Sequence, residues 1–336
     1  MRELTTVGID LAKNVFAVHA VDRDGRVVLR RLIGRGKLAE LIAQLPPSLI
    51  GMESCTGAHE WARRFQVMGH SVRLMAPMFV APYRKSGKND GNDAEAICEA
   101  VSRPNMRYVP IKTRDQQAML TLHRVRQGFV VERTAVVNRI RGLLAEFGVV
   151  MPQRVESLRR ELPAHCETLP TLAARAILDL QQHLRVLDTR IGEYDLELKR
   201  LAGANEDARR LQTIPGIGPI SASAIVATVG SAAEFRNGRQ FAAWLGLTPR
   251  QFSSGGKSRL GPISKRGDAY LRMLLVLGAR SVLQTAARHT DRLSRWVQSI
   301  HARCGYHKAI VAVAAKNARI LWAMLAKKER FTPQFA

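Results

Sequence analysis

Apolar residues that recur at alternating steps of three and four restrict the fold of this chain more than any other feature of its sequence. They are Ile177, Leu180, Leu184, Leu187, Ile191, Tyr194, Leu198 and Leu201. This seam predicts a long helix that buries a narrow apolar stripe against a second helix, as in a coiled coil. The second helix is either the one expected over 113–147 or the same helix of another copy. Because the stripe is narrow and its flanks are charged, we expect pairing between chains and hence a homo-oligomer, either a dimer or a tetramer.

The first 110 residues alternate between strand and helix patterns. The expected strands are 4–11, 15–22, 26–33, 49–53 and 71–76, and the expected helices are 37–45, 58–68 and 92–102. Turn residues separate the runs. The resulting order βββαβαβα predicts an α/β domain of the ribonuclease-H-like type.

Helical patterns dominate the rest of the chain, where no clear strand is expected. A capping box of Thr113 and Gln116 begins the helix that ends near Phe147. Later helices are expected at 219–229, 237–245, 268–287, 291–302 and 308–327. We therefore predict an α/β domain at 1–110, a helical coiled-coil and oligomerisation region at 111–203, and an all-α domain at 204–336.

An excess of positive charge limits the class of partner. The 336 residues include 52 Lys and Arg against 28 Asp and Glu, a formal net charge of +24, and residues 203–336 hold 21 of the basic residues but only 6 of the acidic ones. Such a chain binds a polyanion, and nucleic acid is favoured over a membrane surface because no amphipathic lipid anchor stands out. The longest apolar run is broken by Lys316 and Arg319, and the four cysteines are far apart. We expect a cytoplasmic protein without a membrane span or a disulfide framework.

Four carboxylates lie where their chemistry is informative. Asp10 lies within an apolar strand, Glu53 ends another, and Asp90 and Asp93 are three residues apart. A carboxylate in an apolar strand is unfavourable unless it is paired or binds metal. Acids on strands that face acids on a helix supply the oxygen ligands of Mg²⁺, and two such ions support phosphoryl transfer. The alternatives are that Asp10 is a turn acid and that Asp93 is an ordinary acid of a helix N-terminus.

Two glycines in Pro215-Gly216-Ile217-Gly218-Pro219 predict a tight turn that leads into a helix. The N–H groups at the start of that helix can bind a backbone phosphate without reading sequence. The segment resembles the hairpin of a helix-hairpin-helix DNA-binding motif, which makes Gly216 and Gly218 candidate nucleic-acid contacts. A plain turn between two helices is the alternative.

A flexible loop rich in serine, glycine and cations is expected after residue 249. Its serines are Ser253 and Ser254, and its cations are Arg250, Lys257, Arg259, Lys265 and Arg266. A hydroxyl there could attack a phosphate while the cations stabilise the transition state. Because serine alone is a poor nucleophile, a loop that only binds phosphate is the commoner alternative.

Several motifs, taken together and in this order, resemble the bacterial insertion-sequence transposases of family one-hundred-ten, relatives of the Piv DNA invertase. They are Gly8-Ile9-Asp10-Leu11-Ala12-Lys13, Met52-Glu53-Ser54-Cys55-Thr56-Gly57, Lys88-Asn89-Asp90-Gly91-Asn92-Asp93-Ala94, the Pro215–Pro219 turn, Ala243-Trp244-Leu245-Gly246-Leu247-Thr248-Pro249, and Ser254-Gly255-Gly256-Lys257 with Ile263-Ser264-Lys265-Arg266-Gly267. The resemblance covers nearly the whole chain.

This resemblance implies a RuvC-like N-terminal domain with a DEDD site that binds Mg²⁺ or Mn²⁺. By position the four acids are Asp10, Glu53, Asp90 and Asp93. It also implies that a serine, Ser254 or failing that Ser253, is supplied by another protomer, attacks DNA and holds a 5′-phosphoserine link. A structured non-coding guide RNA would choose the element ends and the target by base pairing. The implied protein is a nucleoid-associated transposase that recombines DNA.

The chain departs from the family pattern at two positions, with Asn89 in place of threonine and Ala12 in place of serine. Neither change removes a predicted ligand. A RuvC-like junction endonuclease that uses water is the alternative enzyme, and a non-catalytic nucleic-acid-binding protein is the alternative of another class. The presence of all four acids and the serine favours an active enzyme.

Overall fold

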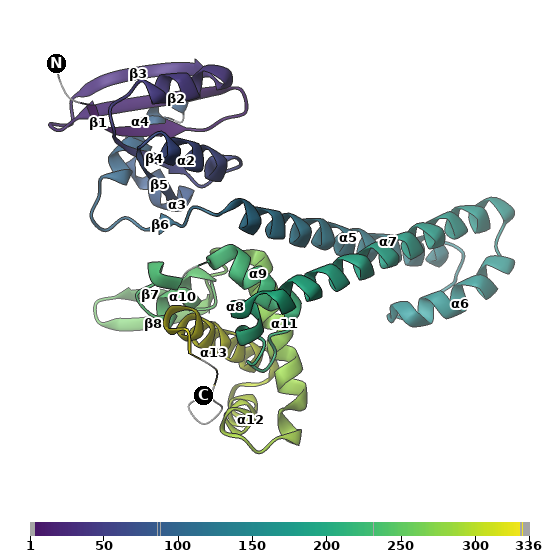
Figure 1. Ribbon diagram of the computed structural model, residues 1–336. Helices are drawn as coiled ribbons and strands as arrows, with labels where there is room; N and C mark the ends of the chain where they lie inside the picture. The colour runs from purple at the N-terminus through teal and green to yellow at the C-terminus, as the bar shows by residue number, and fades with distance from the viewer. Residues whose placement is uncertain (1–3, 86, 88, 231, 330, 332–336) are drawn as a thin grey trace. The chain divides into compact units, whose positions relative to one another are not determined.

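The computed structural model of the protein describes residues 4–85, 87, 89–230, 232–329 and 331. Two compact units divide the chain, Met1–Thr113 and Arg114–Ala336 (Figure 1). The first is a mixed α/β domain, as predicted, and the second is mostly helical. The division into 1–110, 111–203 and 204–336 remains a prediction.

A mixed sheet of six strands forms the centre of the described part of the first unit. The strands are β1 (Leu4–Asp10), β2 (Val15–Asp22), β3 (Val27–Gly34), β4 (Leu49–Glu53), β5 (Ser71–Met75) and β6 (Tyr108–Val109), in the order β3-β2-β1-β4-β5-β6. The first three strands form an antiparallel meander, and β4 and β5 extend the sheet in parallel to β1. This arrangement is that of a ribonuclease-H-like domain, and the short edge strand β6 was not predicted.

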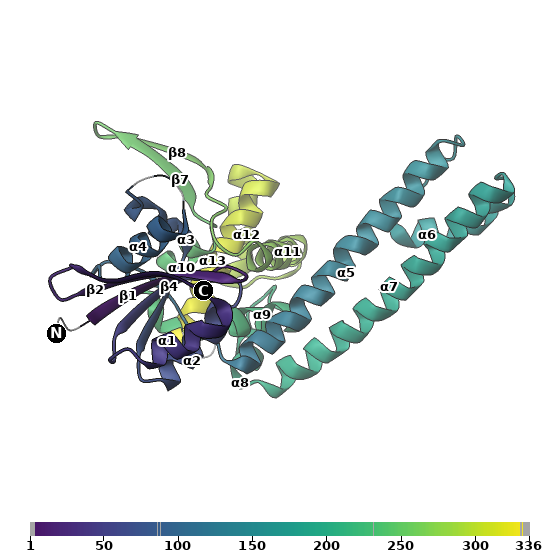
Figure 2. The ribbon, with the colours of Figure 1, turned by 90° about the horizontal axis from the view of Figure 1, so that it is seen from above.

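Helices cover both faces of this sheet (Figure 2). They are α1 (Leu38–Ala43), α2 (Ala58–Val67), α3 (Pro77–Val80) and α4 (Asp90–Val101). Phe16 and Ile9 are fully buried in one core cluster with Phe65 of α2 and Leu38 of α1. Because side chains alternate along a strand, the neighbouring positions face the other side, where α4 packs.

Two glycines let α4 lie directly on the sheet. A Cβ atom at Gly8 would lie 2.3 Å from the Ala94 carbonyl oxygen and 2.4 Å from the Cys98 backbone nitrogen. A Cβ atom at Gly51 would lie 2.7 Å from Cβ of Val101. The α4 backbone thus takes the space that a side chain would fill at Gly8, and the Val101 side chain takes it at Gly51.

The second unit begins with a helical hairpin whose seam is buried within the chain. Its helices are α5 (Arg114–Ala145), α6 (Val155–Glu167) and α7 (Thr171–Ala204). Seam residues Ile177, Leu184 and Leu187 are buried in one cluster with Ile140 of α5 and Leu158 of α6. The prediction that this seam pairs between chains is therefore wrong, because α5 and α6 of the same chain cover it.

Charged flanks, which favoured pairing between chains, instead join the helices of one chain. Asp188 of α7 accepts from Arg133 of α5 and from Arg159 of α6, and Arg126 of α5 pairs with Asp195 of α7. The charges beside the seam thus serve contacts inside the hairpin.

The remaining helices pack around one core. They are α8 (Glu206–Leu211), α9 (Pro219–Val229), α10 (Gly238–Trp244), α11 (Ala269–Thr285), α12 (Arg292–Cys304) and α13 (Tyr306–Lys327). In the described part of the chain, α13 is long and apolar enough to cross a membrane by length and composition alone, but half of its most apolar window is buried. Val313, Ala314 and Leu321 account for this, since they lie in the core of the unit.

A β-hairpin interrupts the helices, although no strand was expected there. Strand β7 (Pro249–Ser254) pairs antiparallel with β8 (Lys257–Ile263). The turn residues Gly255 and Gly256 have φ of 55° and 77°. Two successive positive φ values define the two-residue turn that suits a hairpin and that favours glycine at both positions. The expectation of a flexible loop is therefore wrong, because Gly255 and Gly256 form the turn of a β-hairpin.

A buried histidine ties α5 to the helical core. His123 is only 1% exposed, and its Nδ1 lies 3.0 Å from the Tyr270 hydroxyl of α11. Its Nε2 lies 3.1 Å from the Ser223 hydroxyl of α9, which itself donates to the Pro219 carbonyl oxygen at 2.8 Å. Burial lowers the pKa of His123 to about 4. The neutral ring therefore accepts from Tyr270 at Nδ1 and donates to Ser223 at Nε2.

We expect Gly8→Ala to lower the free energy of unfolding of the first unit by about 1–3 kcal/mol, because the new methyl group must displace the α4 backbone. Gly34→Ala is the matched control, since nothing lies within 4 Å of a Cβ atom there. Urea denaturation of both variants measures the difference. Equal stability of the two variants would contradict the close packing of α4 on β1.

The buried His123 predicts a pH dependence of stability. The unfolded chain takes up a proton on this ring near pH 6.5, whereas the folded protein does so only near pH 4. The free energy of unfolding should therefore fall from pH 6.5 to pH 4, by up to about 1.4 kcal/mol per pH unit. In His123→Gln this contribution should vanish. Denaturation curves of both proteins at several pH values measure it, and an identical pH dependence would refute the assignment.

Candidate active site

Asp10 and Glu53 end neighbouring parallel strands on the same face of the sheet. Ile9 of β1 pairs with Met52 of β4, so the two acids follow at the same level. Each lies two residues after a glycine that contacts α4, and alternate residues of a strand face the same side. Both acids therefore belong to the face that α4 covers.

The first turn of α4 brings Asp90 and Asp93 to the ends of β1 and β4, where Asp10 and Glu53 lie. The Asn89 side chain caps the helix by accepting from the Asn92 backbone N–H at 2.9 Å, and Asp90 and Asp93 follow in the first turn. The helix runs back along β1, because Cys98 contacts the Thr6 carbonyl oxygen with Sγ at 3.7 Å while Ala94 lies over Gly8. Its N-terminus thus points toward the end of β1, where a partial positive charge favours acids.

The contacts of the four acids show whether their carboxylates lie close enough together to share a metal ion. Arg84 donates to Asp93 at 3.0 Å, and the Asp93 side chain is 20% exposed. Cys55 Sγ lies 4.0 Å from the Leu11 carbonyl oxygen, next to the end of β1, and burial, followed by the carboxylates of Glu53 and Asp10, raises the pKa of this thiol. In the ranges that the structure describes, no three His, Cys, Asp or Glu side chains lie close enough together to hold a metal ion. The fold directs the acids to the same ends of the strands, but no three of them come within reach of one metal ion in the described residues.

The donor chemistry of this edge nevertheless fits a divalent ion. All four candidate ligands are carboxylates, and Mg²⁺ and Mn²⁺ prefer oxygen ligands. Asp90 lines a hollow with Arg30 and Arg31, so both helix acids have arginines beside them. Binding of an ion by all four acids would require Asp93 to leave Arg84.

The hairpin separates the two candidate serines onto opposite faces. Ser254 pairs with Lys257 across the strands, and Ser253 pairs with Ser258. Residues directly opposite each other share a face, so Ser254 lies on the same face as Lys257. Arg259, two residues after Lys257 on β8, lies on that face as well. Ser253 lies on the other face, where its hydroxyl oxygen accepts from the Gln251 side chain at 2.8 Å.

Close backbone packing holds the base of the hairpin. A Cβ atom at Gly267 would lie 1.9 Å from the Trp244 carbonyl oxygen, and one at Gly246 would lie 2.2 Å from that of Arg266. The Lys265 backbone, with φ of 54°, donates to the Gly246 carbonyl oxygen at 3.1 Å. The predicted cations Lys265 and Arg266 thus lie on a rigid base, whereas Lys257 and Arg259 lie on the exposed arm.

The turn at Gly216 packs against α11. Gly216 has φ of 84°, and a Cβ atom there would lie 2.6 Å from the Gly278 carbonyl oxygen. Asn317 donates to the Pro215 carbonyl oxygen at 3.0 Å and fixes the turn from α13. Gly218 caps α9 with nothing within 4 Å of a Cβ atom. Packing accounts for Gly216, and phosphate binding at either glycine remains a prediction.

Two contributors to this region were not foreseen. Arg84 lies nine residues before Asp93, in a segment without helical or strand periodicity, so no sequence signal pointed to their ion pair. Cys55 belongs to the Met52–Gly57 motif, and no role was predicted for it, although its position two residues after Glu53 could have placed its thiol at the strand end.

Comparison with known proteins gives a consistent result along the chain. A family model described as a transposase, of the DEDD type of IS110 elements, matches residues 7–149, and the model of the transposase IS116/IS110/IS902 family matches residues 208–294. A probable family 20 transposase of Pseudomonas aeruginosa is 48% identical over 98% of this chain and 99% of its own length. The transposase for insertion sequence element IS1328 of Yersinia enterocolitica is 44% identical over 96% and 97%, and that for IS1111A of Coxiella burnetii is 42% identical over 98% and 92%.

Proposed function

Because this chain belongs to the IS116/IS110/IS902 family of transposases, we propose that it cuts and rejoins DNA through a covalent link to Ser254. It is an insertion-sequence transposase, so its substrate is DNA. The observation that carries the proposal is the position of Ser254 beside a glycine turn, on the hairpin face that also bears Lys257 and Arg259.

In the proposed first step the Ser254 hydroxyl oxygen attacks a phosphorus atom of the DNA backbone. A bond forms between Oγ and phosphorus, the bond from phosphorus to the 3′-oxygen breaks, the hydroxyl proton passes to a base, and the leaving oxygen takes up a proton. Lys257, directly across from the serine, balances charge on the phosphate oxygens. The product is a 5′-phosphoserine and a free 3′-hydroxyl.

In the proposed second step a 3′-hydroxyl of the other DNA end attacks the phosphoserine. The new phosphodiester bond replaces the bond to Oγ, and the serine hydroxyl is restored. Each exchange conserves the number of ester bonds, so no external energy source is needed. Arg250, Lys265 and Arg266 bind flanking phosphates, and such contacts position DNA without reading its sequence.

The four carboxylates are the proposed metal site. Asp10, Glu53, Asp90 and Asp93 would hold Mg²⁺ or Mn²⁺, which supplies charge stabilisation at a reacting oxygen when it is bound. Holding all four ligands would require Arg84 to release Asp93, and the phosphates of a bound strand offer Arg84 another anionic partner. The arrangement supports metal binding that is coupled to DNA binding.

We further propose that a structured non-coding guide RNA selects the element ends and the target by base pairing. The support is the charge: the basic excess of residues 203–336 suits backbone contacts, which carry no sequence information. A homo-oligomer, a dimer or a tetramer, would let the serine of one protomer serve the acids of another. We also propose that the protein acts at the nucleoid, where its DNA substrate lies.

Ser254→Ala should abolish the covalent protein–DNA adduct, because Ser254 is the residue that pairs directly with Lys257 across the hairpin. DNA affinity should change less than about twofold, since one neutral hydroxyl contributes little to binding. Denaturing gels of reactions with labelled DNA measure the adduct. The matched control is Ser253→Ala, which should still form it. An adduct that survives in Ser254→Ala but not in Ser253→Ala would move the nucleophile by one residue.

Asp10→Asn should reduce strand cleavage at least about a hundredfold, because metal stabilisation of a reacting oxygen is worth several kcal/mol. Nucleic-acid binding should persist. Glu99→Gln is the control, since Glu99 lies on α4 but pairs with Arg103. Cleavage assays with added Mg²⁺, Mn²⁺ or chelator provide the measurement, and full cleavage by wild type in chelator would refute the metal site.

A further inference from the structure

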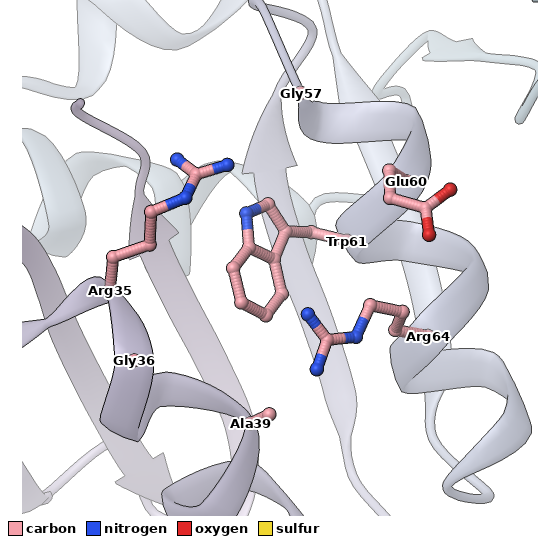
Figure 3. Close-up of a pocket in the computed structure, with 7 residues that line it drawn as sticks. All are labelled: Arg35, Gly36, Ala39, Gly57, Glu60, Trp61 and Arg64. Atoms are coloured by element: carbon pink, nitrogen blue, oxygen red, sulfur yellow. The ribbon is translucent and has the colours of Figure 1, made fainter. Parts of the chain in front are cut away.

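A hollow in the first unit holds two arginines against one tryptophan ring (Figure 3). Its volume is about 400 Å³. The lining residues come from the 3-10 turn Arg35–Lys37, from α1, and from α2 with its cap: Arg35, Gly36, Ala39, Gly57, Glu60, Trp61 and Arg64.

Stacking on Trp61 positions both guanidinium groups. The guanidinium carbon of Arg64 lies 4.5 Å from the centroid of the Trp61 ring, and that of Arg35 lies 5.7 Å from it. Arg35 also lies 5.6 Å from the centroid of Phe16, which packs edge-on against Trp61. A cation over an aromatic face is attracted to it but keeps its N–H groups at the edge of its plane, where they can donate.

The two arginines of this hollow have no ion-pair partner among the residues that the structure describes. In the described ranges neither Arg35 nor Arg64 forms a salt bridge, and both side chains are exposed. Glu60 also lines the hollow, but its carboxylate pairs with Arg63 on the same helix. The hollow therefore has two exposed cations and an acid that is already engaged.

Two residues that line the hollow, Arg35 and Gly57, lie close to the ends of β1 and β4, which carry Asp10 and Glu53. Arg35 donates to the carbonyl oxygen of Lys13, three residues after Asp10, at 3.3 Å. Gly57, at the start of α2, follows Glu53 by four residues and has φ of 87° with nothing within 4 Å of a Cβ atom. The hollow thus lies near the strand ends that carry Asp10 and Glu53, but on the face of the sheet that α1 and α2 cover rather than on the face of α4.

We propose that Arg35 and Arg64 bind a backbone phosphate of the nucleic-acid strand that is handled at the carboxylate edge. The inference rests on the proposed function and adds a strand-positioning site to it. Guanidinium groups match phosphate oxygens in geometry and charge. Trp61 is only 5% exposed and its face is occupied by arginine, so the ring is not available to stack on a base. The site therefore recognises the backbone, without preference for sequence.

The test uses the full chain and the variants Arg35→Gln, Arg64→Gln and the double variant. Fluorescence anisotropy with a labelled single-stranded DNA, and with an RNA of the same sequence, gives the affinity over a range of salt concentrations in the presence of chelator. We expect the slope of log K against log salt to become less steep by about 0.7 for each arginine lost. The change should be the same for a second, unrelated sequence.

Arg73→Gln is the matched control. Arg73 is another exposed arginine of the first unit, and it stacks on Tyr108 at 5.0 Å, outside the hollow. It should retain the wild-type slope. Arg35→Lys with Arg64→Lys keeps the charges and should restore most of the slope, which a misfolded protein would not do. A double glutamine variant with the wild-type slope, or an equal loss in Arg73→Gln, would overturn the inference.

The two nucleic acids distinguish the source of the phosphate. A loss confined to DNA assigns the hollow to the substrate strand, a loss confined to RNA assigns it to a guide, and a loss with both assigns it to a backbone site that accepts either. Because binding is measured in chelator, the result is independent of cleavage. If the slope is unchanged while Asp10→Asn still stops cleavage, this inference fails and the proposed function stands. Wild-type protein that binds neither nucleic acid would overturn both.

Discussion

The packing of α4 on the sheet, through its backbone at Gly8 and through the Val101 side chain at Gly51, is the constraint on which the candidate active site depends. A methyl group at either position would meet atoms of α4 at 2.7 Å or less. With α4 this close, its first turn must lie near the carboxyl ends of β1 and β4. The strand acids two residues beyond each glycine then face the same side. One packing requirement thus orients acids from three segments that are far apart in the sequence.

Bringing acids together at one edge has an electrostatic cost that neighbouring arginines reduce. Arg84 pairs with Asp93, and Arg30 and Arg31 share a hollow with Asp90. On the opposite face of the sheet Arg35 and Arg64 have no acid of their own among the described residues. The two sets of arginines therefore differ: one set compensates carboxylates, and the other leaves positive charge available to an anionic ligand. A strand of nucleic acid is the ligand that could meet both.

The sequence predicted the boundaries of strands better than it predicted which helices and side chains contact one another. Strands 15–22 and 49–53 match β2 and β4 to the residue, because turn residues and apolar runs mark their ends. The heptad seam predicted that a second helix covers it but not which one, since the same apolar stripe can pack against a helix of its own chain or of another copy. The hairpin was missed because its strands are almost wholly exposed and show no apolar alternation. Of the candidate site, the acids followed from local context, whereas their arginine partners depend on tertiary contacts that periodicity does not encode.

The exposed hairpin leaves the proposed nucleophile, Ser254, without a neighbouring base until substrate arrives. In the described part of the chain no histidine or carboxylate hydrogen-bonds to Ser254. A serine without a base is a weak nucleophile, and acids without a hydroxyl cannot form a phosphoserine. Each half of the proposed chemistry is therefore incomplete by itself. An enzyme that breaks and rejoins DNA benefits when neither part can act alone, because cleavage then requires the complex in which rejoining is also possible.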